Sequence, residues 1–193
     1  MGLAATFHDL KDQSVFITGG GSGIGAALTE AFLRQGAKVA FCQRSDATPF
    51  CDAMEKATGN RPLFLPCDIS VTDQLQLTLS TAAKAHGPIT VLVNNAANDQ
   101  RHDTLKTDET CWDWSINVNL RSYFFACQSV IPGMQAAGGG SIINISSISF
   151  MMADKGYAAY ITANAGIVGL PRTLAREFGP DRIRVNAVAP GWV

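Results

Sequence analysis

A glycine-rich segment, residues 18–25, has the composition and position of a phosphate-binding loop. It follows the apolar residues 15–17 and precedes a stretch, 24–35, with the apolar spacing of a helix. Glycine permits positive φ and lets backbone amides approach a ligand closely. A helix N-terminus adds partial positive charge and free N–H groups, so this context predicts a loop that holds the pyrophosphate of a dinucleotide. The residues expected to hold it are Gly19, Ser22, Gly23, Ile24 and Gly25.

The end of the second apolar run, residues 38–42, indicates which dinucleotide would fit. Dinucleotide folds place an acidic residue about 20 residues past the loop to hold the ribose 2′-hydroxyl of NAD, whereas arginine there accommodates the 2′-phosphate of NADP. Gln43 and Arg44 occupy this position. Because Gln43 does not repel a phosphate and Arg44 can pair with one, the sequence favours NADP over NAD. The alternative is that Arg44 is a solvated surface residue.

Short apolar runs alternate with longer helix-like stretches along the chain. The runs are rich in Val, Ile, Leu and Phe, as buried parallel strands require. Glycines such as Gly36, Gly87 and Gly179 follow helix-like stretches as stop signals. The expected strands are 15–17, 38–42, 63–67, 90–93, 141–146 and 184–189, and the expected helices are 24–35, 72–86, part of 108–137, and 157–178. This alternation predicts a single α/β domain over residues 1–193, a Rossmann-type doubly wound parallel sheet between two helix layers.

The composition limits the classes of partner and location. The 193 residues are 47% hydrophobic and 16% charged with a net charge of −1, so nothing favours nucleic acid or an anionic membrane as a partner. The five cysteines form no C-x-x-C pair, so neither a disulfide framework nor a metal site is expected. No apolar run reaches the roughly 18 residues of a membrane span, and the N-terminus lacks a signal-peptide pattern. We therefore expect a cytoplasmic protein.

From Leu10 to its last residue the chain resembles the short-chain dehydrogenase/reductase family. The family's T-G-x-x-x-G-x-G spacing is met within residues 18–25, and three further motifs follow in the family's order. They are Asp68-Ile69 after the third strand, Asn94-Asn95-Ala96-Ala97 after the fourth, where the family has N-N-A-G, and Pro190-Gly191 after the sixth. The resemblance implies cofactor contacts from Asp68, Ile69, Asn95, Ala96, Ala97, Pro190, Gly191 and Val193.

The resemblance also implies a catalytic group of asparagine, serine, tyrosine and lysine. Asn119 fits the asparagine position. Ser147 lies thirteen positions before Tyr160 and fits the serine position, with Ser146 and Ser149 as near alternatives. In the implied reaction, an alcohol loses hydride to NAD or NADP while Tyr160 acts as acid/base. Ser147 would hydrogen-bond the substrate oxygen, and Asn119 would support a proton relay.

The fourth position after Tyr160 is Asn164, where the family has lysine. A phenol has a pKa of about 10 and is a poor base at neutral pH unless a neighbouring ammonium favours the phenolate. Asn164 carries no charge, although its amide could still hydrogen-bond a cofactor ribose. Lys155 is expected to be a solvated loop residue that does not replace the missing cation. The sequence predicts impaired catalysis, with an inactive dinucleotide-binding or oligomer-forming relative as the alternative.

A second departure from the family is length. The chain stops at Val193, where family members continue with a substrate-covering helical segment and a seventh strand. We therefore expect a truncated domain of six strands, with the sixth strand at an open sheet edge and a site more open to water.

The substrate class follows from the resemblance alone. Residues 94–99, 147–152 and 179–193 are similar to the branch of the family that oxidises aldoses at the anomeric carbon. The expected partner is thus a small molecule, a sugar or another alcohol. Candidate substrate contacts are Asn98, Asp99, Ser149 and Trp192, which could instead be ordinary loop residues. The helices that carry Asn119 and Tyr160 form the family's usual dimer face, so a homodimer or larger homo-oligomer is also expected.

Overall fold

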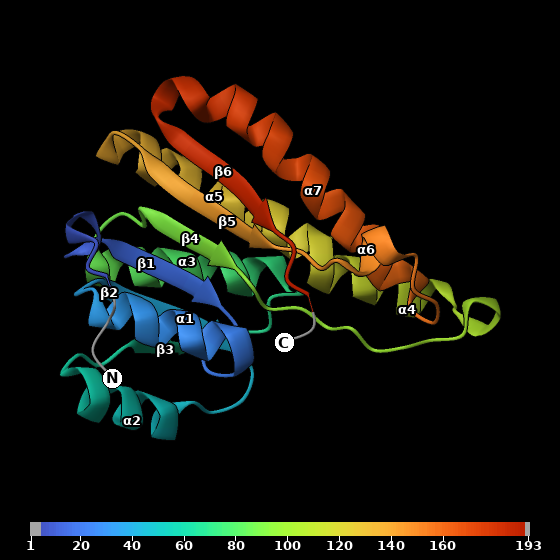
Figure 1. The fold of residues 1–193 in the computed structure, drawn as a ribbon, viewed down its shortest axis with the longest axis horizontal. Coiled ribbons are helices and arrows are strands. Elements are labelled where there is room, and N and C mark those ends of the chain that lie inside the picture. Colours follow the sequence, from blue (N-terminus) through green and yellow to red (C-terminus); the bar gives the residue numbers. More distant parts are fainter. Residues whose placement is uncertain (1–4, 192–193) are drawn as a thin grey trace.

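The computed structural model describes residues 5–191, which form a parallel sheet with helices on both faces (Figure 1). The strands are β1 (Ser14–Thr18), β2 (Lys38–Gln43), β3 (Leu63–Pro66), β4 (Val91–Asn94), β5 (Gly140–Ile145) and β6 (Ile183–Val188). Their order in the sheet is β3-β2-β1-β4-β5-β6, and every neighbouring pair is parallel. This order reverses direction at β1 and β4, as a doubly wound sheet does, and it confirms the predicted fold class.

The helices are α1 (Gly23–Arg34), α2 (Thr48–Thr58), α3 (Thr72–His86), α4 (Glu109–Ile116), α5 (Ser122–Ala137), α6 (Ser149–Met152) and α7 (Ala158–Phe178). Shorter turns are η1 (His8–Leu10), η2 (Thr104–Lys106), η3 (Asn117–Arg121) and η4 (Gly179–Asp181). Three features differ from the sequence-based expectation, of which the short helix α6 is one. Helix α2 was not expected; Cys51 is its one buried residue, and Phe50 and Met54 lie partly buried beside it against the core. A π-helical turn, η3, separates α4 from α5 inside the expected long helix.

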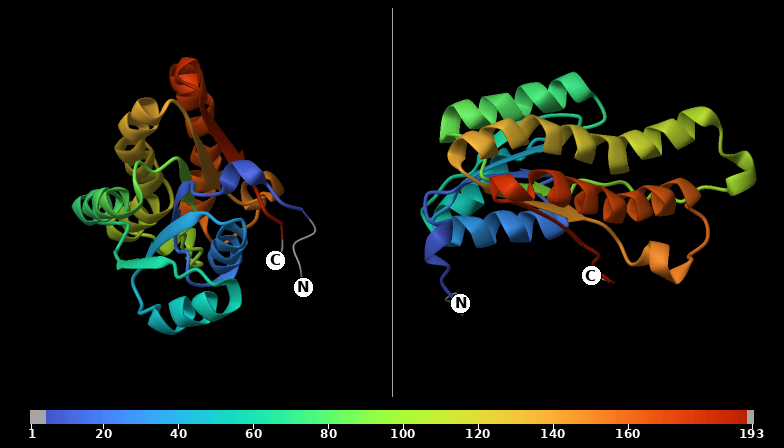
Figure 2. Two further views of the ribbon diagram at one scale, coloured as in Figure 1. Left: turned by 90° about the vertical axis from the view of Figure 1, so that its left-hand side faces the viewer. Right: turned by 90° about the horizontal axis from the view of Figure 1, so that it is seen from above.

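Alternate residues of the strands supply two hydrophobic cores, one on each face of the sheet. Phe16 of β1 and Leu92 of β4 pack on the face that carries α3, α5 and α7. Val15 and Ile17 pack on the opposite face with residues of α1 and α2. Figure 2 shows these two helix layers with the sheet between them. Because strand side chains alternate between faces, each run of apolar residues contributes to both cores.

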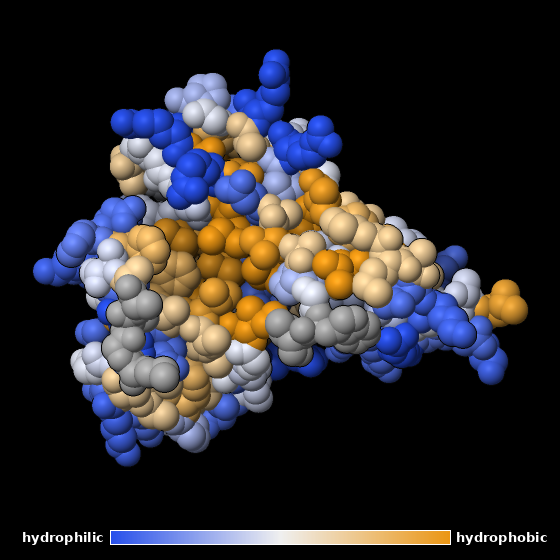
Figure 3. Space-filling view, viewed as in Figure 1, coloured by the Kyte–Doolittle hydropathy of each residue, from blue (hydrophilic) through white to orange (hydrophobic). Residues whose placement is uncertain are grey.

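The second face is covered unevenly. Helices α1 and α2 lie over the half of the sheet that contains β1, β2 and β3 (Figure 1). Among residues 5–191 no helix lies over β5 and β6 on that side, and Figure 3 shows hydrophobic residues gathered there. Within the same part of the chain β6 pairs only with β5, and its Val188 is 47% exposed. The edge expected at the sixth strand is therefore present in the described residues.

The burial of β4 in the core can be tested by truncating one buried and one exposed leucine. Leu92 is 0% exposed, whereas Leu77 on α3 is 68% exposed. We expect Leu92→Ala to lower the free energy of unfolding by about 2–5 kcal/mol, because it removes buried apolar surface and leaves a cavity. Leu77→Ala should change the stability by less than about 0.5 kcal/mol. Urea unfolding of the two variants measures both values, and equal destabilisation would contradict the described core.

Candidate active site

The glycine loop between β1 and α1 folds as its sequence predicts. Gly19 and Gly23 have φ of 70° and 51°, in the left-handed region that favours glycine. A Cβ atom on Gly25 would overlap the carbonyl oxygen of Gly19, so only glycine lets α1 start this close to the loop. Ser22 precedes α1 with extended backbone, and its side chain makes no capping hydrogen bond. The first amides of α1 therefore remain available for an anionic ligand.

The ends of β1 and β4 are tied together beneath this loop. The Thr18 hydroxyl accepts hydrogen bonds from the backbone N–H of Asn95, at 2.9 Å, and of Ala96, at 3.0 Å. The Asn95 side-chain amide donates to the carbonyls of Thr18 and Gly19, at 3.0 and 3.2 Å. These bonds occupy the carbonyl groups of Thr18 and Gly19. The loop is therefore held with its backbone amides directed outward.

Gln43 connects the end of β2, where the sequence predicts the choice between NAD and NADP, to its surroundings. Its Oε1 accepts a hydrogen bond from the Gly21 N–H at 3.1 Å, and its Nε2 donates to the Ser45 carbonyl at 3.1 Å. Gln43 thus joins the glycine loop to the loop after β2 without adding charge. The neighbouring Arg44 is exposed, and both residues line a hollow beside the glycine loop. A guanidinium at this place is the group that would meet a 2′-phosphate.

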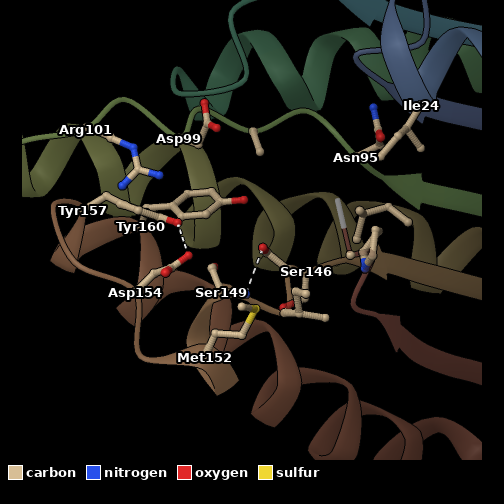
Figure 4. A pocket seen from close by; sticks show the side chains of 16 residues that line it. Ile24, Asn95, Asp99, Arg101, Ser146, Ser149, Met152, Asp154, Tyr157 and Tyr160 are labelled. Atoms are coloured by element: carbon tan, nitrogen blue, oxygen red, sulfur yellow. Dashed lines mark hydrogen bonds between the residues drawn. The ribbon is translucent and has the colours of Figure 1, made fainter. Parts of the chain in front are cut away.

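Two neighbouring hollows lie at the carboxyl ends of the strands and share Ile24, Asn95 and Ala97. The loop hollow, about 450 Å³, lies between the glycine loop and the ends of β2 and β3. The tyrosine hollow, about 320 Å³, lies between the end of β5, α6 and the start of α7 (Figure 4). Ligands of doubly wound sheets bind at this edge, next to the point where the strand order reverses.

The predicted cofactor residues divide between these hollows. Those in the loop hollow are Gly19, Ser22, Ile24, Arg44, Asp68, Ile69, Asn95, Ala96 and Ala97. Those in the tyrosine hollow are Ile24, Asn95, Ala97, Tyr160, Pro190 and Gly191. Gly23 and Gly25 line neither and instead shape the turn into α1. Trp192 and Val193 lie outside the described residues.

Two thiols form part of the loop hollow beside the predicted adenine contacts. Cys42 is the residue before the last of β2 and Cys67 follows β3, and both side chains are buried. A hydrogen bond from the Cys42 thiol lowers the pKa of Cys67 to about 7, whereas the same contact and burial raise the pKa of Cys42. Asp68 is fixed nearby, because its Oδ1 accepts hydrogen bonds from the backbone N–H and the hydroxyl of Ser70.

Ser147 and Tyr160 are brought into the same hollow from different elements. Ser147 follows β5, and its hydroxyl oxygen accepts a hydrogen bond from the Ser149 N–H at 3.2 Å. This bond leaves the hydroxyl proton of Ser147 for a substrate oxygen. Tyr160 lies in the first turn of α7, where its ring centroid is 5.5 Å from that of Tyr157. A hydroxyl donor and a phenol facing one cavity can bind an alcohol oxygen and exchange its proton.

Asn119 lies beside this hollow and does not line it. The π turn η3 places its side chain inward, where it is almost fully buried. Its Oδ1 accepts a hydrogen bond from the Asn98 N–H at 2.8 Å, and its Nδ2 donates to the Asn98 carbonyl at 3.0 Å. Asn119 thus anchors the segment after β4 through the backbone of Asn98. The predicted substrate residue Asn98 is engaged in the same pair and lines neither hollow.

Asn164 also lies outside both hollows. Its side chain is 3% exposed, and its Nδ2 donates back to the Tyr160 carbonyl of the same helix at 3.0 Å. The Asn164 carbonyl accepts a hydrogen bond from the Ser146 hydroxyl, also at 3.0 Å. The amide that could have met a cofactor ribose is therefore used inside α7. Lys155 is exposed and does not line the tyrosine hollow, as expected for a loop residue.

The structure adds three residues to the site that the sequence analysis missed. Arg101, Asp154 and Tyr157 line the tyrosine hollow together with Asp99 and Ser149. Arg101 comes from the segment after β4, and its guanidinium lies 4.4 Å from the Tyr157 ring centroid. No motif marks these residues, because contacts between segments more than fifty positions apart leave no local pattern.

Known proteins match this chain over nearly its whole length. The family described as short chain dehydrogenase matches residues 13–193. The chain belongs to the short-chain dehydrogenase family. This short-chain dehydrogenase is 47% identical over 192 residues to "Probable galactose dehydrogenase GalD" of Rhizobium meliloti (strain 1021), covering 98% of this chain and 75% of that protein. It is 44% identical over 191 residues, with the same two coverages, to D-xylose 1-dehydrogenase of Caulobacter vibrioides (strain NA1000 / CB15N).

A solved structure supports the same relationship. The crystal structure of a protein from Sinorhizobium meliloti 1021, assigned to the short-chain alcohol dehydrogenases, matches with a TM-score of 0.89 and 31% identity. The match covers 94% of this chain and 73% of that one. Family members are oxidoreductases that use NAD or NADP. No helix among residues 5–191 of this short-chain dehydrogenase is both long and apolar enough to cross a membrane.

The residues of the short-chain dehydrogenase fit a dinucleotide. A Cβ on Gly19 would come within 3.1 Å of Ala96, and one on Gly25 would overlap the loop. The glycine cradle, residues 18–25, therefore requires backbone without side chains at these two positions. Its amides suit a pyrophosphate. The shared residues Ile24, Asn95 and Ala97 would let one extended ligand occupy both hollows. No group of three His, Cys, Asp or Glu side chains within residues 5–191 is arranged to hold a metal ion.

If the cradle binds a dinucleotide, a methyl group added at Gly25 should weaken binding, whereas one added at Gly169 should not. Gly25→Ala should raise the Kd for NADPH at least tenfold, about 1.4 kcal/mol, because the new Cβ forces the loop away from α1. Gly169→Ala is the matched control, since a Cβ there meets nothing within 4 Å in the interior of α7. It should leave the Kd unchanged. Fluorescence titration gives both constants, and equal affinities would contradict the cradle.

Proposed function

We propose that this protein is an NADP-preferring dehydrogenase that oxidises an aldose by hydride transfer, at a rate limited by Asn164. The observation that carries the proposal is the continuity between the glycine cradle and the hollow that contains Ser147 and Tyr160. This arrangement would place a dinucleotide bound by its phosphates next to a group that can exchange the proton of an alcohol. The names of two relatives, a galactose dehydrogenase and a D-xylose 1-dehydrogenase, favour an aldose as that alcohol.

Each residue has a separate task in this proposal. Ser147 donates its hydroxyl proton to the substrate oxygen and fixes that oxygen beside Tyr160. Tyr160 takes the alcohol proton as the carbon loses hydride. When bound, the nicotinamide supplies the hydride acceptor. Asn119 holds the segment after β4 against the hollow through Asn98, which is a positioning role.

The proton transfer is the weakened step. A phenol has a pKa of about 10, so little phenolate is present at neutral pH without a neighbouring cation. Asn164 is uncharged, and its amide is turned toward the Tyr160 carbonyl. This observation also favours a second candidate function, an inactive relative that binds a dinucleotide. The two candidates differ in one respect: only the first turns over an aldose.

We also propose that the protein is a homo-oligomer that pairs through α5 and α7. A groove of about 320 Å³ runs between these helices. Its lining is mostly apolar, with Ile131, Leu174 and Phe178, and it also contains Gln128, Gln135 and Glu177. Phe124, at the same groove, is 40% exposed. An apolar face of this kind on two adjacent helices suits contact with a second copy.

The cofactor preference can be tested at Arg44. We expect Arg44→Ala to raise the Kd for NADPH roughly tenfold and the Kd for NADH less than twofold, because only NADPH carries the 2′-phosphate that a guanidinium binds. Arg184→Ala is the matched control, since Arg184 is an exposed arginine at the opposite end of the strands, on β6. Titration with each dinucleotide measures the four constants. Equal losses for NADPH and NADH would contradict the assignment.

The weakened step can be tested by restoring the cation. Asn164→Lys should raise kcat for D-xylose or D-galactose roughly 10²-fold, and the rise of the rate with pH should move to lower pH, because an ammonium favours the Tyr160 phenolate. Asn164→Met is the control, with similar length and no charge. Steady-state rates with NADP from pH 6 to 10 give both readouts. An Asn164→Lys protein that binds NADPH but turns over no aldose would favour the inactive relative.

A further inference from the structure

The tyrosine hollow has a polar end that the proposed chemistry does not use. Its charged lining residues within the described chain are Asp99, Arg101 and Asp154. In Figure 4 Asp99 and Arg101 lie on one side of the two tyrosine rings, and Asp154 and Ser149 lie on the other. Neither hydride transfer nor the exchange of the alcohol proton requires these four side chains. They are therefore available to contact another part of a bound molecule.

Asp154 is held in place by a short chain of contacts. The Tyr157 hydroxyl donates a hydrogen bond to Asp154 Oδ2 at 2.9 Å, and this bond raises the pKa of Tyr157, so the phenol remains a donor. Arg101 packs over the Tyr157 ring and donates from Nη1 to the Lys155 carbonyl at 2.9 Å. The ring is thus fixed from its face and from its hydroxyl. Asp154 Oδ1 has no partner among residues 5–191 and remains an acceptor for a ligand.

Ser149 supplies an independent sign of a ligand. Its side chain is 6% exposed and lines the tyrosine hollow, yet its hydroxyl has no hydrogen-bond partner within the described residues. Buried hydroxyl groups are almost always paired, because an unpaired one loses its bond to water on folding. Rotation about the Cα–Cβ bond of Ser149 would turn this hydroxyl toward the hollow, where a ligand hydroxyl would supply the missing partner.

The charges at this end indicate what kind of ligand it takes. Two carboxylates outnumber one guanidinium, and that guanidinium is already engaged with the Tyr157 ring and the Lys155 carbonyl. A ligand carboxylate or phosphate would face Asp99 and Asp154 and would be repelled. A neutral ligand with several hydroxyl groups would instead donate hydrogen bonds to the carboxylates, which are strong acceptors.

We propose that Asp99, Ser149 and Asp154 form a hydroxyl-binding cluster for the non-reacting hydroxyl groups of a neutral aldose, with Tyr157 and Arg101 as the residues that position it. This inference rests on the proposed function and extends it from the reacting carbon to the rest of the sugar. The cluster selects a neutral sugar over a sugar acid, and a sugar over an alcohol without neighbouring hydroxyl groups.

The first test compares variants of the full-length protein. Asp154→Asn and Ser149→Ala should each raise KM for D-xylose or D-galactose about tenfold with kcat changed less than threefold, since each removes a bond to a part of the sugar that does not react. Tyr157→Phe should show the same split between KM and kcat, because it removes the hydrogen bond that positions Asp154 and keeps the aromatic ring in the hollow. Asp103→Asn in the loop at η2 and Ser80→Ala on the exposed side of α3 are the matched controls and should leave KM unchanged.

The second test changes the sugar and measures binding, so it does not depend on turnover. Ligand-detected NMR of the NADPH-bound protein gives the affinity for the aldose, its 2-, 3- and 4-deoxy forms and D-galacturonate. The wild type should bind at least one deoxy sugar about tenfold more weakly than the parent, and Ser149→Ala or Asp154→Asn should reduce that difference to less than twofold. Galacturonate should bind more weakly than galactose, and Asp154→Asn should narrow the gap.

The outcomes separate the cluster from the proposed function. Aldose binding that is the same in wild type, Ser149→Ala and Asp154→Asn would overturn the cluster and leave the dehydrogenase proposal standing. Galacturonate binding as tight as galactose would also overturn the cluster alone. Failure of the NADPH-bound wild type to bind any aldose would overturn the proposed substrate class and the cluster with it.

Discussion

The close contact between the glycine loop and the first turn of α1 is the constraint on which the rest of the site depends. Gly25 approaches the Gly19 carbonyl so closely that no side chain fits between them. Asn95 then binds that carbonyl and its neighbour from the end of β4. With the loop carbonyls paired from below, the free amides of the helix terminus face the hollow. The packing of the loop therefore creates a phosphate site without the help of a charged side chain.

The parallel sheet turns this local contact into a complete site. Because the strands run in one direction, every loop that follows a strand ends at the same edge of the sheet. The segments after β1, β2, β3 and β4 enclose the loop hollow. The segments after β5 and β6, together with the segment after β4, enclose the tyrosine hollow. Ile24 and Ala97, which border both, come from loops after adjacent strands. The distance between the two hollows is thus set by strand spacing and register, and it does not depend on side-chain flexibility.

The parts that the sequence could predict are those with a local pattern. The glycine loop, the apolar strands and the helix stops each combine residue type with short spacing, and the structure has them at the expected places. Helix α2 was missed because it carries few apolar residues overall, although Phe50, Cys51 and Met54 give it an apolar face. The π turn that holds Asn119 was missed because apolar spacing does not distinguish it from a regular helix. The contact between Arg101 and Tyr157 could not be predicted, since only tertiary packing brings these segments together.

Asn164 shows why fold and chemistry can separate in this chain. A lysine here would have to extend from α7 toward the hollow, whereas asparagine satisfies its amide within the helix, on the Tyr160 carbonyl. The helix keeps its contact with β5 through the Ser146 hydroxyl. Within the described residues, asparagine at this position therefore leaves no buried side-chain atom of its own without a partner. The folded chain accommodates asparagine at this position, and under the proposed function its effect would fall on the one step that needs a charge beside the phenol.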